Sequence, residues 1–164
     1  MIHTARESSD RPDVREVCVD ELGSLCDVDP GVPKFLLDTL RTDHDPKVRS
    51  AAAWAVSDMA SADPARRALL RALAGDKSVS VRADCAMSLA KGAASDESLR
   101  EALKQNVLDA REHSEVRSGA VYGLRRCLRS VKGIRELLFA RFRDPTENED
   151  VRVTCLRVLE PILT

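Results

Sequence analysis

The stretch DPKVRSAAAWAV, residues 45–56, carries the pattern that predicts the fold of this chain. Asp45 followed by Pro46 is typical of a helix start, because an aspartate carboxylate caps free backbone N–H groups and proline fits the first helical turn. The apolar side chains that follow recur at helical spacing, at Val48, Ala52, Ala53 and Val56. They share one face, so the stretch predicts an amphipathic helix with one buried side.

The Val-Arg dipeptide near the start of this helix occurs at five nearly even intervals along the chain. Its valines are Val14, Val48, Val81, Val116 and Val151, separated by 34, 33, 35 and 35 residues. A fixed period of this length indicates a repeat protein. With the valine as position 0, positions 4, 5 and 8 are apolar in every repeat, so each dipeptide is expected to open one helix. These B helices are predicted near 12–26, 46–60, 79–93, 114–129 and 149–163.

Four further helices, the A helices, are predicted between the B helices. They begin near residues 33, 63, 95 and 133, and each carries leucines for the core. Short polar linkers separate the helices, and no segment alternates apolar and polar residues with a period of two. The sequence therefore predicts an all-α fold of about nine helices, in four and a half two-helix repeats, without strands.

Residues 12–164 are expected to form a single array, preceded by a flexible N-terminal segment of residues 1–11. The last B helix is rich in valine and leucine, whereas solenoids usually end in a polar cap. This composition favours a segment of a larger protein. The alternative is a small free-standing protein that dimerises through one end.

The repeats resemble those of a known family. Two-helix repeats of 33–35 residues, with Asp-x-x-Val-Arg before a helix whose core is alanine and leucine, resemble the HEAT family, and residues 45–56 are similar to the HEAT-like repeats of phycobilisome lyases. The resemblance covers nearly the whole chain and implies a right-handed α-α superhelix, a HEAT-like solenoid, whose B helices line the concave face. Tetratricopeptide repeats have a similar period, but their Trp, Gly-Tyr and Pro pattern is missing here.

An arginine follows the valine in every repeat: Arg15, Arg49, Arg82, Arg117 and Arg152. In HEAT-like arrays an arginine at this place typically pairs with acidic or carbonyl groups in the turn of a neighbouring repeat, so the resemblance implies a structural role. The acids expected to accept it are Asp10, Asp13, Asp45, Asp76, Glu115 and Asp150. The alternative is a ladder of arginines that binds an anionic partner.

Position 6 of the B helices is the strongest candidate for a binding surface. It reads Asp20, Trp54, Met87, Tyr122 and Arg157, and it lies off the apolar stripe, so it is expected to point outward. Aromatic residues supply much of the energy of protein interfaces, and methionine adapts to varied shapes. Further candidates beside this column are Asp58, Asp84, Lys91 and Arg126. We expect a partner-binding groove; in the alternative, these side chains pack against the next B helix.

Nothing in the sequence nominates a catalytic group, a cofactor site or a metal site. It contains no glycine-rich phosphate loop, no His-Glu-x-x-His helix and no Gly-x-Ser-x-Gly elbow. The five cysteines form no Cys-x-x-Cys motif, and Cys18, Cys85 and Cys155 occupy the apolar position 4, which predicts reduced core thiols. No apolar run reaches the length of a bilayer span and no signal-peptide core is present, so no membrane contact and a cytoplasmic location are expected.

These observations favour a non-catalytic protein-interaction scaffold or sensor module that binds a protein or peptide along the concave B-helix face. The alternative is a nucleic-acid-binding solenoid, which the net charge of −1 argues against and the basic cluster from Arg125 to Arg135 supports. A second alternative, a bilin lyase-like accessory protein, rests on repeat similarity alone, which does not determine function.

Charge is distributed unevenly along the chain. Residues 1–45 contain eleven acids and five bases, whereas residues 115–143 contain two acids and eight bases. Most of this asymmetry is explained by a solvated surface. The remainder favours the orientation of a charged partner or end-on self-association.

Overall fold

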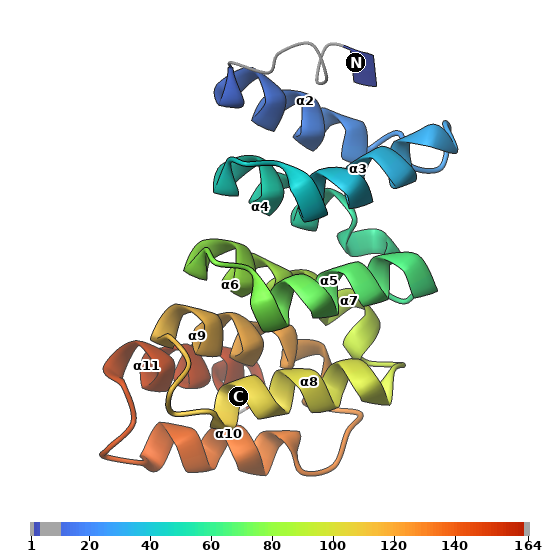
Figure 1. Ribbon diagram of the computed structural model, residues 1–164. Helices are drawn as coiled ribbons and strands as arrows, with labels where there is room; N and C mark the ends of the chain where they lie inside the picture. Colours follow the sequence, from blue (N-terminus) through green and yellow to red (C-terminus); the bar gives the residue numbers. More distant parts are fainter. Residues whose placement is uncertain (1, 4–10, 163–164) are drawn as a thin grey trace.

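The computed structural model describes residues 2–3 and 11–162, which form helices and turns without a strand. Figure 1 shows the helices stacked in a column, from α2 at one end to α10 and α11 at the other. The B helices are α2 (Pro12–Gly23), α4 (Pro46–Ala55), α6 (Val79–Ser88), α9 (Ser114–Gly123) and α11 (Glu149–Leu159). The A helices are α3 (Gly31–Thr42), α5 (Asp63–Gly75), α8 (Glu97–Leu108) and α10 (Ile134–Arg143). Within the described ranges the chain is therefore an all-α solenoid of nine principal helices.

The helices form two layers. Each A helix packs on the B helix that follows it, and consecutive B helices contact one another extensively, whereas consecutive A helices make far fewer contacts. A column that is packed more closely in one layer curves toward that layer. The B helices consequently lie on the inner side of the array.

Four of the five B helices are interrupted, which differs from the continuous helices predicted. Each of these four helices ends about one turn before its predicted end. A short helical element then follows: η1 (Ser57–Met59), α7 (Ala90–Ala93), η2 (Arg125–Cys127) or η3 (Glu160–Ile162). The first B helix ends at Gly23 and continues as turns. The apolar pattern runs through the breaks, since Val56, Leu89 and Leu124 are fully buried there. The apolar periodicity alone could therefore not predict these interruptions.

The apolar stripe forms the core in the interior repeats. The side chains at positions 0, 4, 5 and 8 of α4, α6 and α9 are all fully buried. At the ends the stripe is incomplete: Val14 and Cys18 of α2 are half-buried, and Leu156 of α11 is 42% exposed. The pattern predicts these residues as buried, but burial at these positions also requires a neighbouring layer on the open side.

Two glycines let α9 approach α6 closely. A Cβ atom at Gly119 would lie 2.7 Å from the carbonyl oxygen of Ala83, and one at Gly123 would lie 2.6 Å from that of Ala86. Real Cβ atoms do not come so close to a backbone oxygen. A larger residue at either position would push the two helices apart.

Side chains cap several of the helix starts, including the one predicted at Asp45. Asp45 accepts a hydrogen bond from the backbone N–H of Lys47, and Asn148 accepts one from Asp150. Ser78 makes no side-chain cap at α6. The cap of α9 is His113, whose Nδ1 accepts from the backbone N–H of Glu115. Of the flexible segment expected at residues 1–11, residues 1 and 4–10 lie outside the described part of the chain.

Candidate partner-binding groove

The repeat arginines form a ladder of ion pairs at the N-terminal ends of the B helices. In the first four repeats the guanidinium reaches the carboxylate of an acid in the A-to-B turn of the following repeat. The pairs are Arg15–Asp43 at 3.0 Å, Arg49–Asp76 at 2.8 Å, Arg82–Glu112 at 2.8 Å, and Arg117–Glu147. The first three bind through Nε and Nη2 together. This two-nitrogen fork is the geometry that suits arginine to a carboxylate.

Three of the four ladder acids were not anticipated from the sequence, which nominated only Asp76 correctly. The expected Asp45 instead caps its own helix, and Asp13 pairs with the exposed Arg11. Glu115 and Asp150 are exposed in the first turns of their helices, and Asp10 lies outside the described residues. The missed signal is an acid four or five residues before the valine of each complete repeat, at Asp43, Asp76, Glu112 and Glu147.

Each ladder acid also holds the turn to which it belongs. Its carboxylate accepts a hydrogen bond from a nearby backbone N–H, at Asp45, Ser78, His113 and Asn148 in turn. Burial acts to raise the pKa of Asp43 and Asp76, but the arginine and backbone hydrogen bonds outweigh it and lower the pKa below the ordinary value. The pKa of Glu112 is lowered chiefly by its hydrogen bonds from Arg82.

Arg152 of the last repeat departs from this pattern. Its Nε donates to the backbone carbonyl oxygen of Phe142 at 3.0 Å. No carboxylate among residues 2–3 and 11–162 pairs with it. The last arginine therefore makes a contact within its own repeat but lacks the contact that the others make to the next one.

A groove of about 300 Å³ lies at the opposite, C-terminal ends of three B helices. Trp54 of α4, Met87 of α6 and Tyr122 of α9 line it, each at position 6 and just before its helix is interrupted. The remaining lining residues are Ser57, Ser88, Ala90, Lys91, Arg125 and Arg126. The structure thus brings together the three large side chains of the predicted column.

The large side chains of the groove stand partly clear of the core. Trp54 is 42% exposed, whereas Met87 and Tyr122 are half-buried and Tyr122 packs against the core. The hydroxyl of Ser88 is buried and has no hydrogen-bond partner in the described part of the chain. A buried hydroxyl without a partner carries a desolvation cost that a ligand's hydrogen bond would relieve.

The other predicted binding residues lie outside this lining, apart from Lys91 and Arg126. Asp20 and Arg157 are exposed on the first and last B helices, and Asp84 is half-buried on α6. Asp58 is exposed and forms an ion pair with Lys91 of the next repeat. The column predicted over five repeats therefore forms one groove over the central three.

The basic cluster between Arg125 and Arg135 borders the groove. Its basic residues are all exposed, and none has an ion-pair partner among the described residues: Arg125, Arg126, Arg129, Lys132 and Arg135. The guanidinium of Arg135 lies over the ring of Phe139, 5.8 Å from its centroid. Because Arg125 and Arg126 belong to the groove lining, the α9 end of the groove is positively charged.

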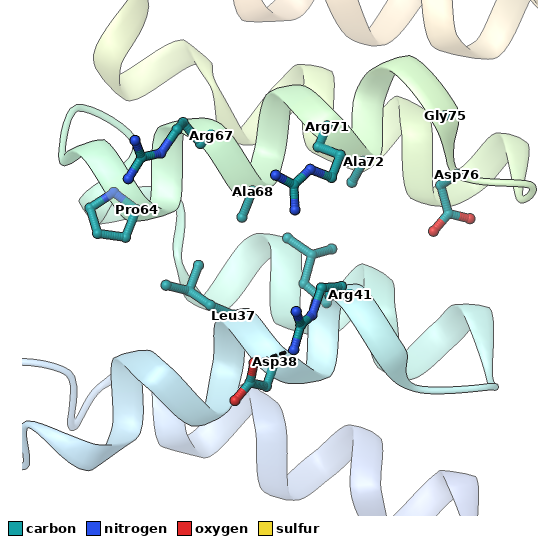
Figure 2. Close-up of a pocket in the computed structure, with 11 residues that line it drawn as sticks. Leu37, Asp38, Arg41, Pro64, Arg67, Ala68, Arg71, Ala72, Gly75 and Asp76 are labelled. Atoms are coloured by element: carbon teal, nitrogen blue, oxygen red, sulfur yellow. Dashed lines mark hydrogen bonds and ion pairs between the residues drawn. The ribbon is translucent and has the colours of Figure 1, made fainter.

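A second hollow, of about 400 Å³, lies between the A helices α3 and α5 and was not predicted from the sequence. Figure 2 shows Ala68 and Ala72 of α5 across from Leu37 of α3, with Arg41 and Arg71 extending from the two helices. Small side chains four residues apart on α5 leave this gap between the two helices. Although the hollow is larger than the groove, its lining contains none of the aromatic side chains that dominate binding energy.

The buried cysteines present no activated thiol. Cys85, Cys127 and Cys155 are fully buried, and burial raises the pKa of each, to about 12 for Cys155. A thiol with a raised pKa stays protonated at neutral pH and is a poor nucleophile. These side chains are therefore suited to packing.

The described residues contain no group of three or more histidine, cysteine or acidic side chains arranged to hold a metal ion. None of the helices in this part of the chain is long and apolar enough to cross a membrane.

A family model described as HEAT repeats matches residues 2–90, and an overlapping match of the same model covers residues 33–125. The two matches together include α2 to α9, and therefore the helices that carry the groove. The comparison with curated proteins gave no match.

Proposed function

This chain belongs to the HEAT-repeat family, whose repeats commonly serve as protein-interaction scaffolds, and on that premise we propose that it is a non-catalytic scaffold whose groove binds a protein or peptide segment. The observation that carries the proposal is the groove's lining, which gathers the only tryptophan and the only tyrosine of the chain around Met87. Tryptophan and tyrosine are enriched among the residues that dominate interface energy. Because the groove is already formed by packed helices, a partner binds with little ordering cost to the scaffold.

The charges beside the groove favour an acidic segment as the partner. Arg125 and Arg126 are exposed without ion pairs in the described part of the chain, whereas Lys91 is already paired with Asp58. A partner carboxylate at the α9 end of the groove meets positive charge that no described carboxylate neutralises. The apolar part of the segment then lies toward Trp54.

A peptide-display selection on the folded chain tests this proposal. Trp54 is the only tryptophan, so its fluorescence directly reports occupation of the groove. We expect the selected peptides to be rich in acids, to shift the Trp54 emission, and to bind Trp54→Ala at least about tenfold more weakly.

Leu108→Ala is the matched control, because Leu108 is similarly exposed but lies at the end of α8, outside the groove lining. It should bind the selected peptides as the unmodified chain does. Peptides that bind Trp54→Ala and the unmodified chain equally well would contradict the proposal.

The exposed basic cluster supports nucleic-acid binding as a second candidate function. Arg129 and Lys132 belong to this cluster but not to the groove lining, so Arg129→Ala with Lys132→Ala separates the two functions. If nucleic acid is the ligand, oligonucleotide affinity falls in this variant and decreases steeply with salt. If a peptide binds in the groove, the variant keeps most of its peptide affinity.

The thiol environments give no support to the bilin lyase-like alternative, because the fully buried cysteines have raised pKa values. We also propose a cytoplasmic location. The five cysteines are all free in the structure, as is usual for proteins kept in a reducing compartment.

A further inference from the structure

The hollow between α3 and α5 has aliphatic side chains in its lining. Its volume of about 400 Å³ lies in the range of pockets that hold small molecules. Leu37 and Leu40 of α3 line it together with Ala68 and Ala72 of α5, and Leu40 is almost fully buried. Gly75 adds open space at the end of α5, because no atom lies within 4 Å of the position of an added Cβ. The hollow therefore offers an aliphatic surface to a ligand.

Arg71 is the cation of this lining that no acid compensates. It is exposed, and its side chain makes no ion pair or hydrogen bond within residues 2–3 and 11–162. The other two arginines of the lining have partners of their own. Arg41 pairs with Asp38 at 2.9 Å, and Arg67 pairs with Asp63 at 2.8 Å. Arg71 is therefore available to bind an anion in the hollow.

The aspartates of the lining leave one positive charge over. The lining contains three arginines and two aspartates, of which Asp76 is held by the fork of Arg49. Arg41 and Asp38 are both more than half exposed, and exposed ion pairs are weak, so Arg41 can exchange this partner for a ligand. Figure 2 shows Arg71 extending from α5 on the same side of the hollow as Arg41 of α3. One anionic group beside these two arginines would balance the charge.

We propose that the hollow binds a small-molecule monocarboxylate with an aliphatic chain, whose carboxylate contacts Arg71 and Arg41 and whose chain lies against Leu37 and Ala72. Guanidinium groups suit carboxylates because two N–H donors match the two oxygens, and the chain is removed from water against the apolar lining. The lining contains no aromatic anchor of the kind on which protein interfaces depend, which favours a small ligand over a protein segment. The site is separate from the groove, because the two linings share no residue.

Titration of octanoate into the ¹⁵N-labelled chain, followed by NMR, tests this proposal. We expect saturable shifts of the backbone amides of residues 37–41 and 67–75. Octylamine carries the opposite charge on the same chain, and acetate carries the carboxylate without the chain, so each should bind at least about tenfold more weakly. The absence of saturable octanoate binding, or saturable shifts confined to other helices, would overturn the proposal.

Two variants test the charge and the space separately. Arg71→Gln removes the uncompensated charge at an exposed position and should weaken octanoate binding at least about tenfold. Ala72→Leu should also weaken it, because the larger side chain fills the hollow while the charge is unchanged. Unchanged circular dichroism melts confirm that a loss of binding is not a loss of folding.

The matched control is Arg129→Gln, because Arg129 is likewise exposed and without an ion pair in the described part of the chain but lies outside the lining of the hollow. It should bind octanoate as the unmodified chain does. Equal octanoate affinities of Arg71→Gln and Arg129→Gln would refute the role of Arg71 and with it the proposed site.

A capped Leu-Glu-Leu peptide presents the same chemistry from a protein segment. It should bind the hollow more weakly than octanoate does, and tighter binding would overturn the assignment to a small molecule. Trp54→Ala should leave octanoate affinity unchanged, and Arg71→Gln should leave the affinity for groove-selected peptides unchanged. Failure of the groove proposal and failure of this one therefore give different results.

Discussion

The two ends of each B helix differ in how regularly their residues recur from repeat to repeat. At the N-terminal ends, the valine and arginine recur in every repeat, and in the interior the valines are buried and the arginines are held by acids of the next repeat. At the C-terminal ends, position 6 changes from tryptophan to methionine to tyrosine, and the side chains line a groove. The difference shows that the regular part of the repeat is used for stacking. The variable part is free to define a binding surface.

The largest effect is expected from Val81→Asp, at the N-terminal end of a B helix, where the valine recurs in every repeat. Val81 is fully buried at position 0 of α6, where a carboxylate would be removed from solvent. An unpaired buried charge is costly, so we expect the free energy of unfolding to fall by at least about 3 kcal/mol, measured by thermal and urea unfolding with circular dichroism.

Val28→Asp is the matched control, because the same substitution is made at a side chain that is 76% exposed. Its effect should stay within about 0.5 kcal/mol. Similar melts for the two variants would show that position 0 is not part of the core.

A smaller effect is expected from Arg117→Ala, which removes one rung of the ladder. Glu147 would remain buried with only the more distant Arg141, 3.8 Å away, as a cationic neighbour. We expect a loss of about 3 kcal/mol, and a double-mutant cycle with Glu147→Ala should show strong coupling.

The contrast for this rung is Arg111→Ala, since Arg111 forms an ion pair with Asp109 on the exposed surface. It should cost less than about 0.5 kcal/mol. Equal losses for the two arginines would mean that the ladder is no stronger than a surface ion pair.

The smallest effect is expected in the dependence of stability on pH. The ladder carboxylates of Asp43, Asp76 and Glu112 have lowered pKa values, so the folded chain binds their protons more weakly than the unfolded chain does. Their contribution is complete above the ordinary carboxyl pKa of about 4 and is lost as the pH falls toward the folded values. Unfolding midpoints should therefore decrease below about pH 4.

Glu112→Gln should flatten this acid decline, because it removes one of the groups that titrate differently in the two states. Glu97→Gln changes an exposed glutamate at the start of α8 that is not part of the ladder and serves as the comparison. If the stability of the two variants declines equally steeply at acidic pH, Glu112 is not responsible for the acid decline.

The fold could be predicted from the sequence because its signal is repeated. The spacing of Val48, Val81 and Val116 and the apolar positions after each valine are local properties, and five copies reinforce one another. The breaks before η1 and η2 could not be predicted in this way, since Val56 and Leu124 continue the apolar stripe through them. Periodicity reports which side is buried and says little about whether the backbone stays α-helical.

The groove was predicted in part, for a related reason. Trp54, Met87 and Tyr122 share one position of the repeat, so helix geometry alone places them in a row. Whether Asp20 and Arg157 join that row depends on how far neighbouring repeats are displaced, which no single repeat encodes. The ladder acids Asp43 and Glu112 were missed because other acids, such as Asp45 and Glu115, stand equally near the repeat valines, and sequence alone does not show which carboxylate reaches the arginine of the preceding repeat.

The double use of each ladder acid has a consequence for how the array comes apart. The carboxylate of Asp76 holds its own turn through Ser78 and holds the preceding repeat through Arg49, so neither contact survives alone if that turn opens. Local opening therefore spreads to the adjacent repeat, and the cooperative unit is larger than one helix pair. Amide hydrogens are consequently expected to be well protected around α4 and α6, whose repeats are joined by the Arg49–Asp76 pair.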